Sequence, residues 1–356
     1  MLRIVMIMIL GGLSTACSLL QAAELPAPSG DSIVAADAKL ELLFTRSAPI
    51  SGGLTEGPAV APDGSIYFTD IPFGKEDGMI LRFDPKMGKT TVFTDKSGKA
   101  NGLIFDSQGR LLACEGAGYG GRRISRWNVQ TGTRETVVDQ YQGKKFNAPN
   151  DLCLDAQGNL YFSDPKYVGH EARELEFRAV YRVTPTGSIT EATHEVSKPN
   201  GVAVSPDGKT LYVAEHDNGT DNLDTDTTPP KQGPMRIYAF ALDDQGKAVS
   251  RRTLVEFGTK IGCDGMTVDR QGHVYLTVRD PSRPGVLIVE PKEGREVGFI
   301  PTGPAMQTGK ELVGLPSNVE FGLGPEAHVL YITVDKSLYR IPLKTRGFHR
   351  QYGDRL

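Results

Sequence analysis

Six polar residues recur at one position of a repeated sequence unit, eight residues ahead of a turn. The six residues are Glu56, Asn101, Asn150, Asn200, Asp264 and Asn318. The first five turns are marked by Gly64, Gly109, Gly158, Gly208 and Gly272. The sixth turn is Gly324-Pro325-Glu326, in which Glu326 lies eight residues after Asn318. Carboxylate and carboxamide oxygens are the ligands that hard divalent cations prefer in proteins. If the repeated units surround an axis, this shared register predicts one metal site.

The repeated unit predicts a six-bladed β-propeller with four-stranded antiparallel blades. Its turns recur at intervals of 45 to 64 residues, and segments rich in β-branched and aromatic residues follow most of them, such as residues 65–70 and 159–164. Four short strands fit each unit, with almost no helical periodicity. The last unit lacks sequence for an outer strand, whereas residues 40–45 form an unassigned apolar stretch near the N-terminus. We therefore expect residues 40–45 to complete the sixth blade.

The predicted architecture turns the shared register into a ring of oxygen ligands. The innermost strand of each propeller blade faces the central channel, so residues at one offset converge on the axis. The ring then contains two carboxylates and four carboxamides, with no thiolate or imidazole for a softer metal. Calcium, which accepts about 6 to 8 oxygen ligands, is the first choice, and zinc, magnesium and manganese are the alternatives. Taken singly, pairs such as Asn101-Gly102 and Asp264-Gly265 would be ordinary turn formers, and only their common register argues otherwise.

Further candidates are expected at the mouth of the channel, where the second strand of each blade ends. The strand-end carboxylates are Asp70, Glu115, Asp164 and Glu215. His216 is placed to contact a substrate or to protonate a leaving alkoxide, although a rim histidine is more often simply solvated. Arg122 and Arg123 are candidates for binding a carboxylate or a hydroxyl-rich ligand, although such a pair usually lies on the surface. The polar residues 217–234 form either a lid or a plain surface loop.

The N-terminus has the order of a secretory signal peptide. Arg3 precedes an apolar run over residues 4–13, and small residues surround Cys17. We assign residues 1–23 to the signal peptide, residues 24–38 to a flexible leader and residues 39–356 to the propeller. The apolar run is too short to span a bilayer, so we expect export to the periplasm or the extracellular space, with a lipid anchor on Cys17 as the alternative.

Charge and cysteine content exclude other classes of protein. The net charge is -3 and both signs are interspersed, which argues against a nucleic-acid partner. After removal of the signal peptide three cysteines remain, Cys114, Cys153 and Cys263, far apart and without metal-ligand spacing. Disulfide bonds are therefore not expected to organise the fold.

The chain resembles the gluconolactonase and regucalcin (senescence marker protein) family over about residues 50–345. The matching segments are Thr55-Glu56-Gly57-Pro58, Ala148-Pro149-Asn150-Asp151, Lys198-Pro199-Asn200-Gly201 and Cys263-Asp264-Gly265-Met266, together with Cys114-Glu115 and Arg122-Arg123. This resemblance implies a propeller that holds one divalent cation and hydrolyses small-molecule sugar lactones. Ala148 occupies the place where some members carry an arginine, which leaves the substrate preference open.

The resemblance also implies individual roles. Glu56, Asn200 and Asp264 would bind the metal, and Asn150 would bind the metal or the substrate. Asp264 would also be the general base for water that attacks a metal-polarised carbonyl, with metal-bound water as the rival source of hydroxide. Register and position, more than the matching motifs, make four further residues candidates for substrate contact: Asn101, Glu115, His216 and Asn318. Two other functions stay open, an organophosphate hydrolase resembling diisopropylfluorophosphatase and a non-catalytic ligand-binding propeller.

Overall fold

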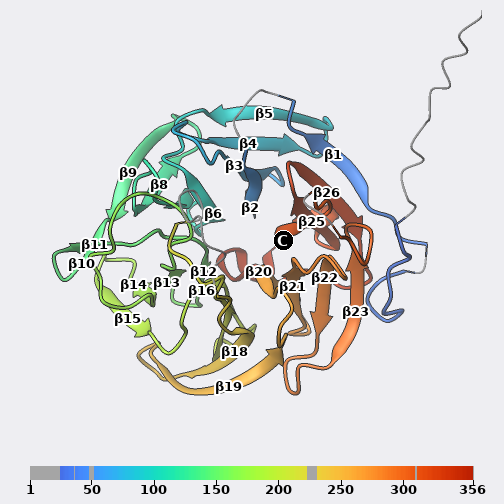
Figure 1. Cartoon of the computed structure of the whole chain (residues 1–356). Coiled ribbons are helices and arrows are strands. Elements are labelled where there is room, and N and C mark those ends of the chain that lie inside the picture. Colours follow the sequence, from blue (N-terminus) through green and yellow to red (C-terminus); the bar gives the residue numbers. More distant parts are fainter. Residues whose placement is uncertain (1–24, 36, 48–51, 223–230, 309–310, 356) are drawn as a thin grey trace, which may run out of the picture.

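The computed structural model describes residues 25–355 except residues 36, 48–51, 223–230 and 309–310. These residues form a six-bladed β-propeller, which confirms the fold predicted from the repeat (Figure 1). The helical segments of this described part are two short 3-10 helices, Gly324–Glu326 and Arg350–Arg355. No helix within the same residues is long and apolar enough to cross a membrane. The predicted signal peptide, residues 1–23, lies outside the described residues.

Each blade is a four-stranded antiparallel sheet whose first strand lies at the channel. Blade 1 contains β2 (Leu54–Val60), β3 (Ile66–Ile71), β4 (Met79–Asp84) and β5 (Lys89–Thr94), and blade 2 contains β6 (Ala100–Phe105), β7 (Leu111–Glu115), β8 (Arg123–Asn128) and β9 (Thr133–Val138). Blade 3 contains β12 (Leu152–Leu154), β13 (Leu160–Ser163), β14 (Val180–Val183) and β15 (Ile189–Thr193), after a small hairpin of β10 (Gln140–Tyr141) and β11 (Lys144–Lys145). Blade 4 contains β16 (Pro199–Val204), β17 (Thr210–His216), β18 (Met235–Leu242) and β19 (Ala248–Glu256), and blade 5 contains β20 (Cys263–Val268), β21 (Val274–Val278), β22 (Gly285–Val289) and β23 (Glu296–Pro301).

The sixth blade joins the two ends of the propeller domain, as predicted for residues 40–45. It contains β24 (Pro316–Phe321), β25 (Val329–Val334), β26 (Ser337–Pro342) and, as its outer strand, β1 (Glu41–Thr45). Glu41 pairs with Arg340 and Thr45 pairs with Ser337. Because β1 supplies the outer edge of the last blade, the first and last strands of the propeller are joined by backbone hydrogen bonds.

The hydrophobic core lies between neighbouring blades. One cluster joins blades 1 and 6 through residues that include Val60, Phe68, Tyr331 and Leu338. Each sheet is covered by neighbours on both faces, and β7 is accordingly buried at all five positions. A sheet covered on both faces produces nearly continuous apolar strands rather than strict alternation. The cysteines Cys114, Cys153 and Cys263 are buried and unpaired within this core, as the sequence indicates.

The structure corrects the expectation of a flexible leader over residues 24–38. Ser29 forms a β-bridge with Phe299, and Ile33 and Val34 are only 2% and 1% exposed. The backbone N–H of Lys344 donates to the carbonyl oxygen of Ile33 at 2.7 Å. Ile33 and Val34 pack into the cluster of blades 5 and 6, which explains why this part of the leader is held against the propeller.

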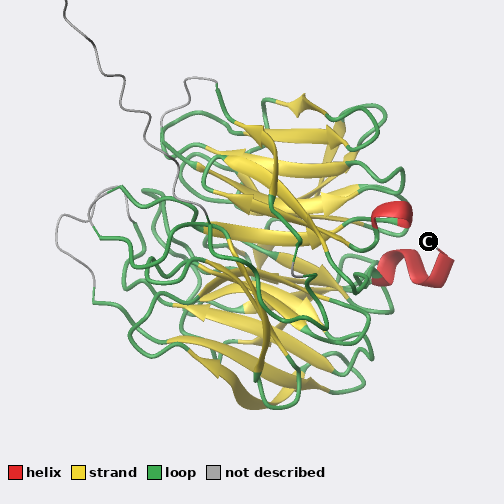
Figure 2. Ribbon diagram, turned by 90° about the vertical axis from the view of Figure 1, so that its right-hand side faces the viewer, coloured by secondary structure: helices red, strands yellow, loops and turns green. Residues whose placement is uncertain are grey.

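The C-terminal segment after β26 covers the end of the channel away from the mouth. The N–H of Phe348 donates to Val268, Arg350 donates to the carbonyl oxygen of Ser205 at 2.9 Å, and the Tyr352 hydroxyl donates to Val60 at 2.7 Å. These contacts reach blades 5, 4 and 1. Figure 2 shows the two short helices on the side of the molecule opposite the long connecting loops.

Candidate metal and substrate site

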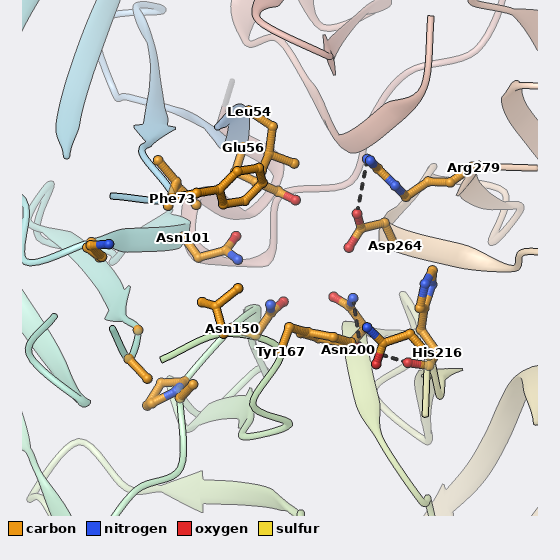
Figure 3. A pocket seen from close by; sticks show the side chains of 18 residues that line it. Leu54, Glu56, Phe73, Asn101, Asn150, Tyr167, Asn200, His216, Asp264 and Arg279 are labelled. Carbon is orange, nitrogen blue, oxygen red and sulfur yellow. Dashed lines mark hydrogen bonds and ion pairs between the residues drawn. The ribbon is translucent and has the colours of Figure 1, made fainter. Parts of the chain in front are cut away.

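One cavity at the mouth of the channel collects five of the six ring residues. Glu56, Asn101, Asn150, Asn200 and Asp264 line this cavity of about 210 Å³ (Figure 3). They come from blades 1 to 5, so residues far apart in sequence meet at one place. The predicted mouth residue His216 lines the same cavity. The shared sequence register therefore corresponds to a shared location.

The inner strands aim these side chains through a repeated irregularity. The pairing between the first and second strand of a blade shifts register after Glu56, Ala100, Pro199 and Cys263. Such a β-bulge bends a strand and redirects a side chain. The dipeptides Asn101-Gly102, Asn200-Gly201 and Asp264-Gly265 therefore lie in bulged inner strands and not in turns.

The glycine after a ring residue allows neighbouring inner strands to approach closely. A Cβ atom on Gly201 would lie 2.4 Å from the carbonyl oxygen of Asp264. A Cβ atom on Gly265 would lie 2.2 Å from side-chain atoms of Asn318. Any side chain at these positions would push blades 4, 5 and 6 apart, so the glycines are required for the ring to close.

The floor of the cavity has two features that fit a hard divalent cation. Glu56 is 3% exposed, and its burial, together with the nearby carboxylates of Asp264 and Asp151, raises the pKa of Glu56 well above its usual range. The Oδ1 atom of Asn101 is buried and has no hydrogen-bond partner among the described residues. A cation would bind that oxygen and would compensate the clustered negative charge.

Carboxamide oxygens would have to complete such a ligand set. Within the described ranges, no group of three His, Cys, Asp or Glu residues could hold a metal ion. The cavity instead combines the carboxylates of Glu56 and Asp264 with the side-chain amides of Asn101, Asn150 and Asn200. This all-oxygen set suits calcium or magnesium better than a thiophilic metal.

His216 lies at the cavity as a neutral imidazole. Its Nδ1 atom is 2.9 Å from the backbone oxygen of Cys263, and because a carbonyl oxygen only accepts hydrogen bonds, Nδ1 carries the proton. Burial lowers the pKa of His216. Its Nε2 atom is then a proton acceptor, so His216 must first take up a proton before it can protonate a leaving group.

Tyr167 fixes the orientation of Asn200. Its hydroxyl donates to the carbonyl oxygen of His216 at 3.0 Å and accepts a hydrogen bond from Nδ2 of Asn200 at 3.1 Å. The Asn200 amide is thereby turned so that Oδ1 remains for a ligand. Burial raises the pKa of Tyr167 well above its usual range, which keeps this hydroxyl protonated. The Lys198 ammonium lies 4.1 Å from the centroid of the Tyr167 ring.

Arg279 is a charged cavity residue that the sequence reasoning missed. Its Nη1 atom lies 3.3 Å from Oδ2 of Asp264 (Figure 3). A second register could have revealed it. In four blades the residue directly before the ring residue pairs with a residue of the second strand, and the residue after that partner lines the cavity: Ile71, Gly116, His216 and Arg279.

Asp151 was also missed, although it follows Asn150 in one of the matching segments. It accepts hydrogen bonds from the N–H groups of Leu152 at 3.0 Å and Val202 at 3.3 Å, and burial raises the pKa of Asp151 to about 7. Asn318 donates to its Oδ1 atom at 3.5 Å. Asn318 thus lies against Asp151 and does not line the cavity, which corrects its expected substrate contact.

Glu115 also departs from its expected substrate contact. It is fully buried, and its carboxylate pairs with Arg123 at 2.8 Å and Arg134 at 3.4 Å. Both of its oxygens are therefore engaged, and it does not line the cavity. Arg123 is occupied by this ion pair, while Arg122 donates to the carbonyl oxygen of Phe146 at 2.7 Å. These residues support the fold beside the site.

Asp164 has a positioning role at the start of blade 3. Its two oxygens accept the N–H groups of Asn147 at 2.8 Å and Ala148 at 2.7 Å. These bonds fix the segment that leads into Asn150. The strand-end carboxylate therefore holds a ring residue in place and does not itself face the cavity.

The polar insertion over residues 217–234 is described except for residues 223–230. Asn218 lines the cavity, and Asp221 forms ion pairs with Arg173 and Arg178. The described part of the insertion therefore borders the mouth. Its action as a lid stays a prediction.

Comparison with known proteins matches the same region of the chain. The family model described as the SMP-30/gluconolactonase/LRE-like region matches residues 54–336. A gluconolactonase from Zymomonas mobilis is 28% identical over 319 residues, which cover 82% of this chain and 79% of the relative. A pentonolactonase from Haloferax volcanii is 28% identical over 297 residues, with coverages of 82% and 85%. The solved structure of a gluconolactonase from Xanthomonas campestris has a TM-score of 0.71 and 27% identity, covering 90% of this chain and 96% of that chain.

Proposed function

Because the chain belongs to the SMP-30/gluconolactonase/LRE-like family, we propose that it hydrolyses a sugar lactone at the channel mouth with the help of one divalent cation, calcium being the first choice. The protein is a lactone-hydrolysing enzyme, in line with its named relatives. One observation carries the location of the reaction. Five oxygen-bearing side chains from five blades line a single cavity at one end of the channel.

The cation would be held by Glu56, Asn150, Asn200 and Asp264, with Asn101 Oδ1 as a further oxygen. The burial of Glu56 close to Asp264, and the buried Asn101 Oδ1 atom that has no hydrogen-bond partner among the described residues, support this assignment. A bound divalent cation polarises a carbonyl group and stabilises the negative charge that develops on its oxygen during attack.

The residues around the cavity can manage the proton balance of ring opening. The oxygen of a water molecule bonds to the lactone carbonyl carbon, the ring C–O bond breaks, and the ring oxygen leaves as an alkoxide. Asp264 takes the proton of the attacking water and returns it to this alkoxide, which gives a hydroxy acid. Arg279 holds Oδ2 of Asp264 at 3.3 Å, and Figure 3 shows the other oxygen toward the cavity.

His216 and the asparagines would orient the reactants. The Nε2 atom of His216 accepts a hydrogen bond from the attacking water or from a substrate hydroxyl, because Nδ1 is already committed to Cys263. Asn101 and Asn150 present amide groups to the same cavity. Fixing water and substrate in this way lowers the entropic cost of the reaction.

Asp264→Asn tests the proposed base while keeping the size of the side chain. We expect kcat on D-glucono-δ-lactone, assayed with calcium, to fall by about 10²- to 10⁴-fold, with the secondary structure unchanged by circular dichroism. Bound metal is measured on the same sample. The matched control is Asp244→Asn, an exposed carboxyl in the connection between β18 and β19, which should retain wild-type kcat. An Asp264→Asn variant with normal turnover would refute the assignment.

The same preparation separates the alternative functions. Turnover of phosphofluoridates far above that of any lactone would favour an organophosphate hydrolase. If a chelator lowers only the thermal stability and no lactone is opened, the cation ties the blades together and the propeller is not catalytic.

A further inference from the structure

The cavity at the mouth has two chemically different sides. Blades 4 and 5 supply Asn200, His216, Asp264 and Arg279. Blades 1 to 3 supply, besides the ring residues on the floor, Lys99, Tyr167 and a set of side chains that we call the apolar wall: Leu54, Ile71, Phe73, Ala117, Ala148, Pro149 and Val168. Figure 3 shows Leu54 and Phe73 on one side of the cavity and Asp264, Arg279 and His216 on the other.

The apolar wall is held in place by the structure around it. Leu54 and Ile71 are paired residues of β2 and β3, two positions nearer the mouth than Glu56. The ammonium of Lys99 donates to the carbonyl oxygens of Pro72 at 3.3 Å and Gly74 at 2.5 Å, the residues on either side of Phe73. The Lys99 ammonium, which lines this side of the cavity, is thereby engaged with the backbone of the loop around Phe73. Its role is to fix that loop, which gives the wall a defined shape.

Phe73 is 48% exposed although it lines the cavity. An aromatic ring in this position keeps apolar surface in water until something apolar covers it. Ala117 and Ala148 line the same cavity with short side chains and are 2% and 8% exposed. An apolar group bound between Phe73 and these alanines would remove the exposed surface of the ring from water.

A fully hydroxylated sugar lactone does not match this side of the cavity. Each hydroxyl that leaves water needs a hydrogen-bond partner, and an unsatisfied one opposes binding. The side chains of the apolar wall contain only carbon and hydrogen and offer no partner. Polar partners are concentrated on the floor and on the side of blades 4 and 5.

We propose that the preferred substrate is a sugar-sized lactone in which a ring carbon bears an alkyl or aryl substituent that lies against the apolar wall. This inference rests on the proposed lactone hydrolysis and specifies its substrate class. The ester group occupies the polar side, beside Asp264 and His216, and the substituent covers Phe73. Each methylene that the wall removes from water raises kcat/KM about fourfold.

A series of δ-lactones tests this substrate class on the full-length protein with calcium present. The series is δ-valerolactone and its analogues with a methyl, propyl or pentyl group on the carbon that carries the ring oxygen, with D-glucono-δ-lactone as the reference. We expect kcat/KM to rise about fourfold per methylene over the first few carbons. Phe73→Ala should lower the ratio of kcat/KM for the pentyl lactone to that for D-glucono-δ-lactone by about tenfold.

Phe177→Ala is the matched control. Phe177 is 45% exposed, follows Tyr167 in the same connection and stacks on His194 at 4.3 Å, but it does not line the cavity. It should leave the ratio of the two substrates at the wild-type value. A ratio that changes equally in both variants would overturn the role of the wall.

The outcomes also distinguish this inference from the function on which it rests. If kcat/KM is flat or falls along the alkyl series while D-glucono-δ-lactone is opened efficiently, the apolar preference is refuted and lactone hydrolysis stands. If no lactone of either kind is opened, both fail together.

Discussion

Asp151 should make the calcium-free protein less stable as the pH rises. Asp151 is only 6% exposed. Its burial, with a smaller contribution from Asp264, raises the pKa of its carboxyl to about 7, against 3.8 for an ordinary aspartate. Between these two pH values the folded chain keeps this proton and the unfolded chain has released it. The free energy of unfolding therefore falls as the pH rises through this range. From pH 5 to pH 8 the loss is about 2 to 3 kcal/mol, or about 3 to 4 °C in Tm for a chain of this length.

Asp151→Asn isolates this contribution, because an amide keeps an acceptor oxygen for the N–H of Leu152 but cannot ionise. In the presence of a chelator, we expect the unfolding free energy of the variant to gain about 2 to 3 kcal/mol relative to the wild type between pH 5 and pH 8. Millimolar calcium should reduce this gain, because a cation near Glu56 and Asp264 favours the ionised form of Asp151. Urea unfolding at several pH values, with and without calcium, measures both effects.

Glu320→Gln is the matched control for the effect of calcium on the pH dependence. Glu320 lies at the covered end of the channel, beside Phe348 and His349, and burial raises its pKa to about 8. This variant should show the same pH trend, but calcium should not alter it. Parallel pH profiles for the wild type and Asp151→Asn would refute the reasoning on Asp151. Equal calcium effects on the two variants would refute a cation close to Asp151.

Three further substitutions probe the site and the ring. Arg279→Met removes the guanidinium 3.3 Å from Asp264, so calcium should bind about fivefold more tightly by calorimetry, and unchanged affinity would contradict this electrostatic link. Lys198→Met removes the ammonium that donates to Oδ1 of Asn218 and to the carbonyl oxygen of Thr220. We expect the free energy of unfolding to fall by about 2 to 3 kcal/mol and limited proteolysis to cut first near residues 217–222. A first cleavage elsewhere would count against this role of Lys198. Phe44→Ala removes an edge contact with Phe68 at 5.5 Å and should cost about 2 kcal/mol in urea unfolding, whereas Leu42→Ala, at a residue 53% exposed, should cost less than about 0.5 kcal/mol. Equal losses in these two variants would show that β1 does not hold the ring through Phe44.

The fold was predictable because every blade repeats the same local pattern. Turn glycines and β-rich segments mark each inner hairpin, and the missing outer strand of blade 6 pointed to residues 40–45, which form β1. The leader was mispredicted from its composition. Ile33 and Val34 are too few to show periodicity in sequence, and only the groove between blades 5 and 6 explains their burial.

The candidate site was predictable where position depends on register alone. Ring residues occupy one offset of the repeated unit, so the convergence of five of them on one cavity followed from spacing. Contacts that depend on which side chain approaches from another strand could not be predicted from spacing. Glu115 shares its register with other strand-end carboxylates, but its role is decided by Arg123 and Arg134, which approach from β8 and β9. The same limit applies to Asn318, whose partner Asp151 comes from the opposite side of the ring.

The ring residues and the loop residues of the apolar wall are supported by different kinds of structure, and this separates chemistry from selectivity. Glu56, Asn200 and Asp264 lie on inner strands whose approach is limited by glycines such as Gly201, so their positions cannot change without moving whole blades. Phe73 and Val168 lie in connections between strands, where substitution leaves the sheets intact. Variation in these connections can therefore alter which lactone fits while the oxygen ligands and Asp264 stay in place. It follows that substrate preference in this propeller should be changed by loop substitutions such as Phe73→Ala and not by substitutions in the ring.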